Sequence, residues 1–303
     1  MLRALHLLPA ISALLLLLAV SLLPTEAADS LVADGATLER VADGYKFTEG
    51  PAVDREGNVF FTDQPNDRIL KWSLDGSVAT WLQPCGRSNG LFFDQQGNLL
   101  ACADGQNELW SIQHDKTHTV LLKGYEEKLF NGPNDLWIAA DGSCYFTDPY
   151  YRRDYWTREN LDAQLPKRVY RFSPDSKTLQ IAADDFKQPN GIVGDPQKKL
   201  LYVADIGDKK TYRFQIADDG SLTHRTLFCE MGSDGMTLDT DGNLYLTGKG
   251  VTVFSAEGKK LQNIEVPEGW TANVCFGGAD RDLLFITASD SLYQVKMKTS
   301  GIK

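Results

Sequence analysis

Short apolar runs separated by polar turns recur in pairs along this chain, and a carboxylate or carboxamide residue precedes each pair. In most repeats a glycine follows that residue directly. Repeats of about 45 residues with several strands each are typical of β-propellers, one repeat per blade. The pattern therefore predicts an all-β fold, a six-bladed β-propeller. The six anchor residues, spaced 40, 45, 56, 44 and 39 residues apart, are Glu49, Asn89, Asn134, Asn190, Asp234 and Asn273.

The first repeat contains a complete expected blade. Pro51–Asp54 and Val59–Thr62 are two predicted strands joined by a turn, and Arg68–Leu74 and Val78–Leu82 are the third and fourth. Glycine in the joining turn supplies the positive φ that a tight hairpin needs. Similar turns occur at 95–98, 140–143 and 240–243.

The last repeat yields only three strands, within Asn273–Phe276, Leu283–Thr287 and Leu292–Val295. Thr37–Val41 precedes the first repeat and has no blade of its own. Pairing this N-terminal strand with the last blade would close the ring and leave no open sheet edge. We therefore expect residues 28–303 to form one propeller domain closed by its N-terminal strand. A seven-bladed ring would need a further repeat, which the sequence does not show.

Residues 1–27 have the features of a secretory signal peptide. Arg3 gives a positive start, Ile11–Leu23 is rich in leucine, and Thr25 and Ala27 are small residues at the −3 and −1 positions of a cleavage site. An uncleaved membrane anchor is the alternative, although a spanning helix needs ~20 apolar residues. We expect cleavage after Ala27 and a secreted or periplasmic mature protein, with no membrane attachment.

Charge and cysteine content narrow the choice of partners. The net charge is −10, which disfavours nucleic acid or an anionic membrane as a partner and suits a cation. Because the number of cysteines is odd, at least one of them is unpaired within a single chain. Whether one disulfide forms among the others is left open. Most of them lie in apolar strand patterns, which indicates buried thiols; they are Cys85, Cys102, Cys144, Cys229 and Cys275.

Four anchors carry the strongest chemical signal: Glu49, Asn134, Asn190 and Asp234. A propeller directs its blade entrances at one central channel, so these side chains should converge. Two carboxylates and two carboxamides form an all-oxygen donor set, which suits Ca²⁺ or Mg²⁺ better than a His-based metal site. A purely structural metal that ties the blades together is the alternative to a catalytic one.

A second series of acidic residues follows the anchors by 14 or 15 positions: Asp63, Asp104, Asp148 and Asp205. A hairpin of that length returns the chain to the anchor face, so these residues should form a second ring outside the first. Turn capping accounts for most of them, and Asp148 and Asp205 are the expected exceptions. We therefore expect Asp148 to contact substrate.

Residues 86–90 match Gly-x-Ser-x-Gly, the nucleophile elbow of α/β-hydrolases, but a strand pattern follows where that elbow needs a helix. Ser88 is therefore not expected to be a nucleophile. Arg87 and Asn89, at the same blade entrance, are instead expected to bind substrate.

The longest spacing reflects an insertion at 149–167, which starts on the anchor face directly after Asp148. It is rich in aromatic and basic residues. Two interpretations stay open: a lid that stacks on a polar ring, or a loop packed on a neighbouring blade. On the first, Tyr150 and Tyr151 bind substrate.

Several of these motifs together resemble the SMP-30/gluconolactonase/regucalcin-like family over essentially the whole mature chain. They are Glu49-Gly50-Pro51, Asn134-Asp135-Leu136, Phe146-Thr147-Asp148-Pro149, Pro189-Asn190-Gly191-Ile192 and Ser233-Asp234-Gly235-Met236. The resemblance implies a divalent cation, usually Ca²⁺, with Glu49, Asn190 and Asp234 as ligands and Asn134 binding the ion or its substrate and water. Zn²⁺, Mg²⁺ and Mn²⁺ stay open as alternatives. Asp104-Gly105 and Gly132 depart from the family pattern, which leaves the substrate in doubt.

The resemblance also implies hydrolysis of a sugar-type lactone. We expect a cation that polarises the lactone carbonyl and Asp234 as the general base on water. The alternatives are phosphotriester hydrolysis at the same ion and a non-catalytic binding propeller with a structural metal.

Overall fold

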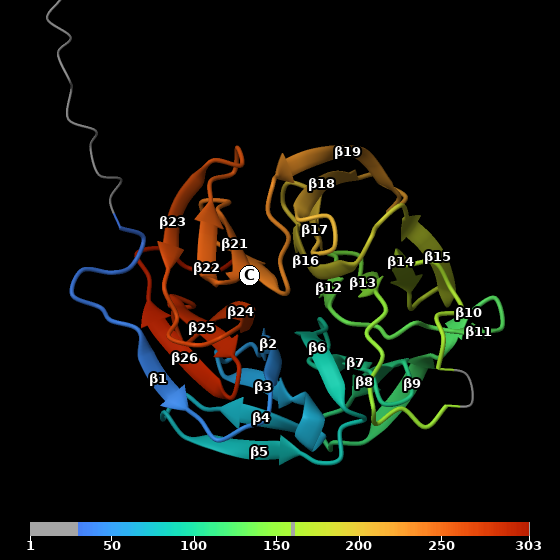
Figure 1. The fold of residues 1–303 in the computed structure, drawn as a ribbon, viewed down its shortest axis with the longest axis horizontal. Coiled ribbons are helices and arrows are strands. Elements are labelled where there is room, and N and C mark those ends of the chain that lie inside the picture. The colour runs from blue at the N-terminus through green and yellow to red at the C-terminus, as the bar shows by residue number, and fades with distance from the viewer. Residues whose placement is uncertain (1–29, 159–160, 303) are drawn as a thin grey trace, which may run out of the picture.

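The computed structural model describes residues 30–158 and 161–302, which form six four-stranded antiparallel sheets around a central axis (Figure 1). The predicted six-bladed β-propeller is confirmed. The expected signal peptide, residues 1–27, lies outside the described residues. Among those that are described, no helix is long and apolar enough to cross a membrane.

Each blade runs from an inner strand to an outer one in chain order, apart from the last. Blade 1 contains β2 (Thr48–Val53), β3 (Val59–Asp63), β4 (Arg68–Trp72) and β5 (Val78–Leu82). Blade 2 contains β6 (Ser88–Phe93), β7 (Leu99–Ala103), β8 (Glu108–Ile112) and β9 (His118–Leu122). Blade 3 contains β12 (Leu136–Ile138), β13 (Cys144–Asp148), β14 (Arg168–Ser173) and β15 (Thr178–Ala183).

The second half of the ring repeats this arrangement. Blade 4 contains β16 (Pro189–Asp195), β17 (Leu200–Asp205), β18 (Lys210–Ile216) and β19 (Leu222–Cys229). Blade 5 contains β20 (Met236–Leu238), β21 (Leu244–Gly248), β22 (Gly250–Phe254) and β23 (Lys260–Ile264). Blade 6 contains β24 (Thr271–Gly277), β25 (Leu283–Ala288), β26 (Ser291–Lys296) and β1 (Glu39–Ala42). Outside the blades lie the short hairpin β10 (Gly124–Tyr125) and β11 (Lys128–Leu129) and the 3₁₀ turn η1 (Gln64–Asn66).

The ring closes as the sequence predicts. β1 pairs antiparallel with β26, with Glu39 opposite Gln294 and Arg40 opposite Tyr293. The N-terminal strand thereby becomes the outer strand of the last blade, beside the C-terminal strand (Figure 1). This pairing covers an edge that a three-stranded blade would expose.

Apolar side chains between neighbouring sheets form the core. Ala52 and Phe60 of blade 1, for example, pack in one buried cluster with Leu91, Leu99 and Ala101 of blade 2. Burial of a Leu or Phe side chain stabilises a fold by ~1.5–3 kcal/mol, so these inter-blade layers hold the ring together.

The five cysteines are all buried and unpaired, in agreement with the interpretation as buried thiols. Burial raises the pKa of Cys85 and of Cys275 to about 12. These thiols therefore stay protonated and unreactive at neutral pH.

Candidate active site

The inner strands bring the anchor residues together at one end of the central channel. β2, β6, β12, β16, β20 and β24 each contact the next around the ring, and most of them are labelled around the centre in Figure 1. Glu49 and Asn190 lie at the starts of β2 and β16, while Asn134 and Asp234 lie two residues before β12 and β20. Each blade thus presents its anchor at the same place.

Glycine after the anchor allows this close approach. A Cβ atom on Gly50, whose φ is 36°, would lie 2.0 Å from the carbonyl oxygen of Asn89 in the next blade. A Cβ atom on Gly235 would lie 1.9 Å from Cγ of Asn273. No side chain fits at such distances, so glycine at these positions lets one anchor pack on the next.

Asn190 and Asp234 make the central polar contact of the site. Nδ2 of Asn190 donates to Oδ1 of Asp234 at 2.7 Å and to the hydroxyl of Tyr151 at 2.9 Å. Oδ1 of Asn190 is buried and has no hydrogen-bond partner among the described residues. A buried carbonyl oxygen without a partner costs free energy, and this oxygen is therefore a suitable donor for a ligand.

The two carboxylates of the site affect each other. Burial raises the pKa of Glu49 well above its ordinary value, and the nearby charge of Asp234 raises it further. Desolvation raises the pKa of Asp234 to about 6, although hydrogen bonds from Trp270 and Asn190 favour its ionised form. Two acidic groups held together in this way attract a cation that neutralises both.

These residues fit a hard divalent cation. Carboxylate and amide oxygens are the donors that Ca²⁺ and Mg²⁺ prefer, and one amide oxygen is already unpartnered. In the part of the chain that the structure describes, no three His, Cys, Asp or Glu side chains are grouped to hold a metal. A cation here would therefore depend on Asn134 and Asn190 as well as on Glu49 and Asp234.

Trp270 is a site residue that the sequence interpretation missed. Its Nε1 donates to Oδ2 of Asp234 at 2.6 Å, and the residue is 39% exposed. No other repeat has a Trp three residues before its anchor, so the repeat pattern gave no signal. This hydrogen bond orients the carboxylate of Asp234.

Asp135 is a second such residue. It occupies the position that is glycine in four other repeats, and its Oδ2 lies 3.5 Å from Nδ2 of Asn273 in the opposite blade. Burial raises its pKa to about 7. Asp135 and Asn273 therefore span the channel beside the anchors, and the departure from glycine was the signal available in the sequence.

Most aspartates of the second acidic series cap the backbone just before an anchor. Asp63, Asp148 and Asp205 each accept hydrogen bonds from the backbone N–H groups two and three residues before the anchor of their own blade. Asp148 receives them from Asn131 and Gly132 at 3.0 and 2.8 Å. Asp148 and Asp205, the expected exceptions, thus make the same capping bonds as Asp63. Substrate contact by Asp148 stays a prediction, with its two oxygens already engaged by the backbone.

Ser88 and its two neighbours make hydrogen bonds to other parts of the protein. Ser88 is fully buried in β6, and its Oγ donates to the carbonyl oxygen of Cys85 at 2.6 Å. The buried Asn89 accepts a hydrogen bond from Thr62 at its carbonyl oxygen. Arg87 donates to the carbonyl of Pro65 at 2.7 Å and lies over the ring of Tyr155. Ser88 therefore lacks the exposure of a nucleophile.

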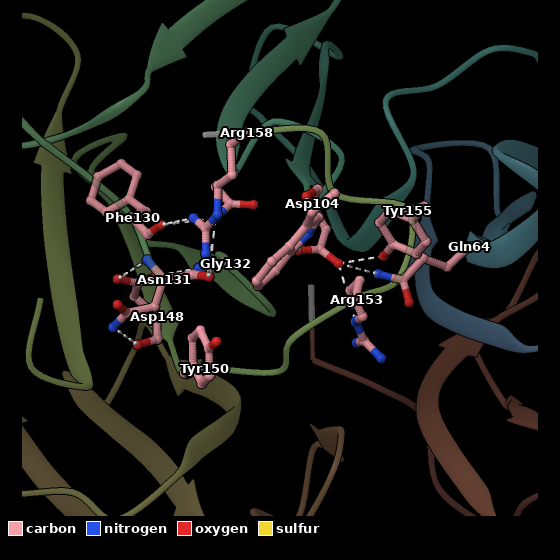
Figure 2. Close-up of polar contacts among 12 residues, drawn as sticks. Gln64, Asp104, Phe130, Asn131, Gly132, Asp148, Tyr150, Arg153, Tyr155 and Arg158 are labelled. Carbon is pink, nitrogen blue, oxygen red and sulfur yellow. Dashed lines mark hydrogen bonds and ion pairs between the residues drawn. The ribbon is translucent and has the colours of Figure 1, made fainter. Parts of the chain in front are cut away.

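The insertion both packs on its neighbours and reaches the mouth. Trp156 is buried, and the hydroxyl of Tyr150 donates to the carbonyl of Leu161 within the insertion. Tyr151, in contrast, meets Asn190 directly. Gln64, Arg153 and Tyr155 converge on the carboxylate of Asp104 (Figure 2). The insertion is thereby fixed to blade 2 beside the anchors.

Comparisons with known proteins agree with this fold. A family model described as the SMP-30/gluconolactonase/LRE-like region matches residues 47–290. A gluconolactonase from Zymomonas mobilis is 28% identical over 293 residues, covering 87% of this chain and 82% of the relative. A lactonase from Staphylococcus haemolyticus is 26% identical over 246 residues, covering 75% and 72%. The structure of a gluconolactonase from Xanthomonas campestris superposes with a TM-score of 0.83 at 32% identity, covering 90% and 93%. Because the family model spans most of the chain, this protein belongs to the SMP-30/gluconolactonase family.

Proposed function

We propose that this protein is a divalent-cation-dependent lactonase that opens a sugar-type lactone at the anchor end of the channel. Family membership and the lactonases among its relatives support the reaction class. The observation that carries the proposal is the Asn190–Asp234 contact beside Glu49, with Oδ1 of Asn190 buried and lacking a partner among the described residues. Such a set of oxygens binds a hard cation.

Glu49, Asn134, Asn190 and Asp234 would hold the ion. Ca²⁺ is the proposed metal, with Mg²⁺, Mn²⁺ and Zn²⁺ as alternatives. When bound, a divalent ion supplies Lewis-acid stabilisation of the negative charge that develops on a lactone carbonyl oxygen. Tyr151 and Trp270 hydrogen-bond to Asn190 and Asp234 and hold these two side chains in place.

Asp234 is the proposed general base. In the metal-free protein burial raises its pKa to about 6, so the carboxylate is largely ionised at neutral pH and can accept a proton. As a water oxygen attacks the carbonyl carbon, Asp234 accepts the proton that the water loses. The bond between the carbonyl carbon and the ring oxygen then breaks, and the ring oxygen takes that proton to give the open-chain hydroxy acid.

A panel of lactones followed in a pH-stat, with and without chelator, tests the proposal. We expect turnover that chelation abolishes and Ca²⁺ restores. Turnover that survives complete chelation would overturn the role of the cation. If no lactone is hydrolysed but a phosphotriester is, the chain is a phosphotriesterase; if neither reacts, a binding propeller is the better description.

A further inference from the structure

Asp104 differs from its counterparts in what its carboxylate binds. In blades 1, 3 and 4 the equivalent aspartate caps the backbone just before the anchor. In blade 2 that backbone is capped by Asp67, which accepts from the N–H groups of Cys85 and Arg87 at 3.1 and 2.6 Å. Asp104 is thereby released from capping and is available to bind side chains.

The released carboxylate holds the insertion. Oδ2 of Asp104 accepts from Nε of Arg153 at 3.3 Å and from the hydroxyl of Tyr155 at 2.5 Å, and Gln64 donates to the same oxygen at 3.2 Å. Nε1 of Trp156 donates to the carbonyl oxygen of Asp104 at 2.9 Å. Asp104 is itself buried, so these contacts fix the position of Arg153 (Figure 2).

The outer nitrogens of Arg153 are available to a ligand. Asp104 engages only Nε, and neither Nη1 nor Nη2 hydrogen-bonds to a described residue. In Figure 2 these outer nitrogens point away from the Asp104 carboxylate. The Arg153 side chain is 31% exposed, and a guanidinium normally uses its two outer nitrogens as a bidentate fork for an oxyanion.

Arg153 lies close to the proposed cation site. Its guanidinium carbon is 5.4 Å from the ring centre of Tyr151, whose hydroxyl accepts from Asn190. The positive charge of Arg153 lies near enough to act on the carboxylates of both Glu49 and Asp234. A substrate bound at the anchors would therefore find a fixed positive charge beside it.

Gly132 lies against Asp104 and Trp156, where there is no room for a larger side chain. A Cβ atom there would lie 3.0 Å from Oδ1 of Asp104 and 3.4 Å from Cζ2 of Trp156. The φ of 149° is a further obstacle to a larger residue. Glycine at this position thus leaves the space that the Asp104–Trp156 contact occupies.

We propose that Arg153, positioned by Asp104, is a specificity-determining residue that binds an oxyanion substituent of the lactone, so that the preferred substrates are acidic sugar lactones. This inference rests on the proposed lactonase function. It adds a second point of recognition, away from the reacting carbonyl, that favours a charged substrate over its neutral counterpart.

Two lactones that differ in one substituent test the inference: D-glucarolactone, which carries a carboxylate, and D-gluconolactone of the same ring size, which carries a hydroxymethyl group. The quantity measured is the ratio of their kcat/KM values with Ca²⁺ present. We expect the wild type to prefer glucarolactone and Arg153→Met to lower the ratio by about 10- to 100-fold, because a charge-assisted bidentate contact is lost. Arg153→Lys keeps the positive charge but cannot make a bidentate contact, so its kcat/KM ratio should lie between those of the wild type and Arg153→Met.

Arg152→Met is the matched control. Arg152 is the same residue type one position earlier and is exposed, so its loss should leave the ratio unchanged. Asp104→Asn tests positioning: KM for glucarolactone should rise while kcat is retained, because the reacting carbonyl is untouched. An equal fall in kcat on both lactones would show that Asp104 only stabilises the fold.

A binding measurement separates the inference from the proposed function. Calorimetry gives the affinities of the wild type and Arg153→Met for D-glucarate and D-gluconate. If gluconolactone is hydrolysed but Arg153→Met leaves the kcat/KM ratio unchanged, the inference is overturned and the lactonase stands. If neither lactone reacts, the function fails, and the inference then stands only if glucarate binds better than gluconate and Arg153→Met removes that preference.

Discussion

Asn190 and Asp234 come from neighbouring blades and meet at 2.7 Å, amide nitrogen to carboxylate oxygen. The contact fixes the amide so that its oxygen, not its nitrogen, is left without a partner among the described residues. An amide oxygen held in this way beside a carboxylate is preorganised for the proposed cation, since neither side chain would have to be ordered on binding.

The protein is expected to bind one divalent cation per chain. At a Ca²⁺ concentration 100 times Kd the free energy of unfolding should rise by ~2.7 kcal/mol, which raises Tm by roughly 5–10 °C in a chain of this size. Elemental analysis and a thermal melt with and without chelator measure this. Asn190→Leu has a similar shape but no amide oxygen, so its melt should respond little to Ca²⁺. An unshifted melt in the wild type, with no bound metal, contradicts the prediction.

Asp234→Asn separates metal binding from proton transfer. The variant keeps an oxygen for the ion but loses the proton acceptor, so kcat should fall by about 10²–10⁴-fold. Its affinity for the metal should weaken less than that of Glu49→Ala, where a charged ligand disappears entirely. A metal-loaded Asp234→Asn protein that turns over its best lactone at the wild-type rate would place the base elsewhere.

Ser88→Ala should keep most of the activity. Ser88 is fully buried and bonded to the carbonyl of Cys85, so its loss removes one hydrogen bond and ~0.5–1.5 kcal/mol of stability. Initial rates and a urea melt on the same preparation measure both effects. A loss of activity near a thousandfold with the fold intact would show instead that Ser88 is a nucleophile, as an elbow serine would be.

Asp148 makes the metal-free protein less stable as pH rises from about 4 to about 7. Burial raises its pKa to about 7, so in this window the native state keeps a proton that the unfolded chain has lost. The free energy of unfolding attributable to this group then falls with rising pH, by roughly 2–4 kcal/mol over the window. Urea unfolding in chelator at pH 5 and pH 7.5 should show a shallower pH dependence in Asp148→Asn than in the wild type. Equal slopes would mean that Asp148 titrates as it does in the unfolded chain.

The repeat pattern alone was sufficient to predict the fold. Blade number, closure by the N-terminal strand and the places of Glu49 and Asp234 follow from anchor spacing, because each repeat forms the same four-stranded unit. Gly50 and Gly235 are a physical reason for this regularity, because no larger residue would let one anchor lie against the next.

Side-chain partners supplied by non-repeating segments could not be predicted in the same way. Asp104 and Asp148 occupy the same repeat position, yet one holds the insertion and the other caps a turn. The difference depends on Asp67, which takes over the cap in blade 2 and has no fixed place in the repeat. Trp270 likewise reaches Asp234 from the connection between β23 and β24, at a position where no other repeat has a Trp.

Pairing of β1 with β26 also affects how the chain is made. Gln294 hydrogen-bonds to Glu39, 255 residues earlier, so the last sheet stays incomplete until synthesis is almost finished. Contacts this distant in sequence form slowly, because a long loop must close before they stabilise anything. A nascent chain that ends in blade 5 already contains Glu49 and Asp234 but has no ring to hold them together. Gain of affinity for the proposed cation would therefore be a direct signal of ring closure during synthesis and refolding.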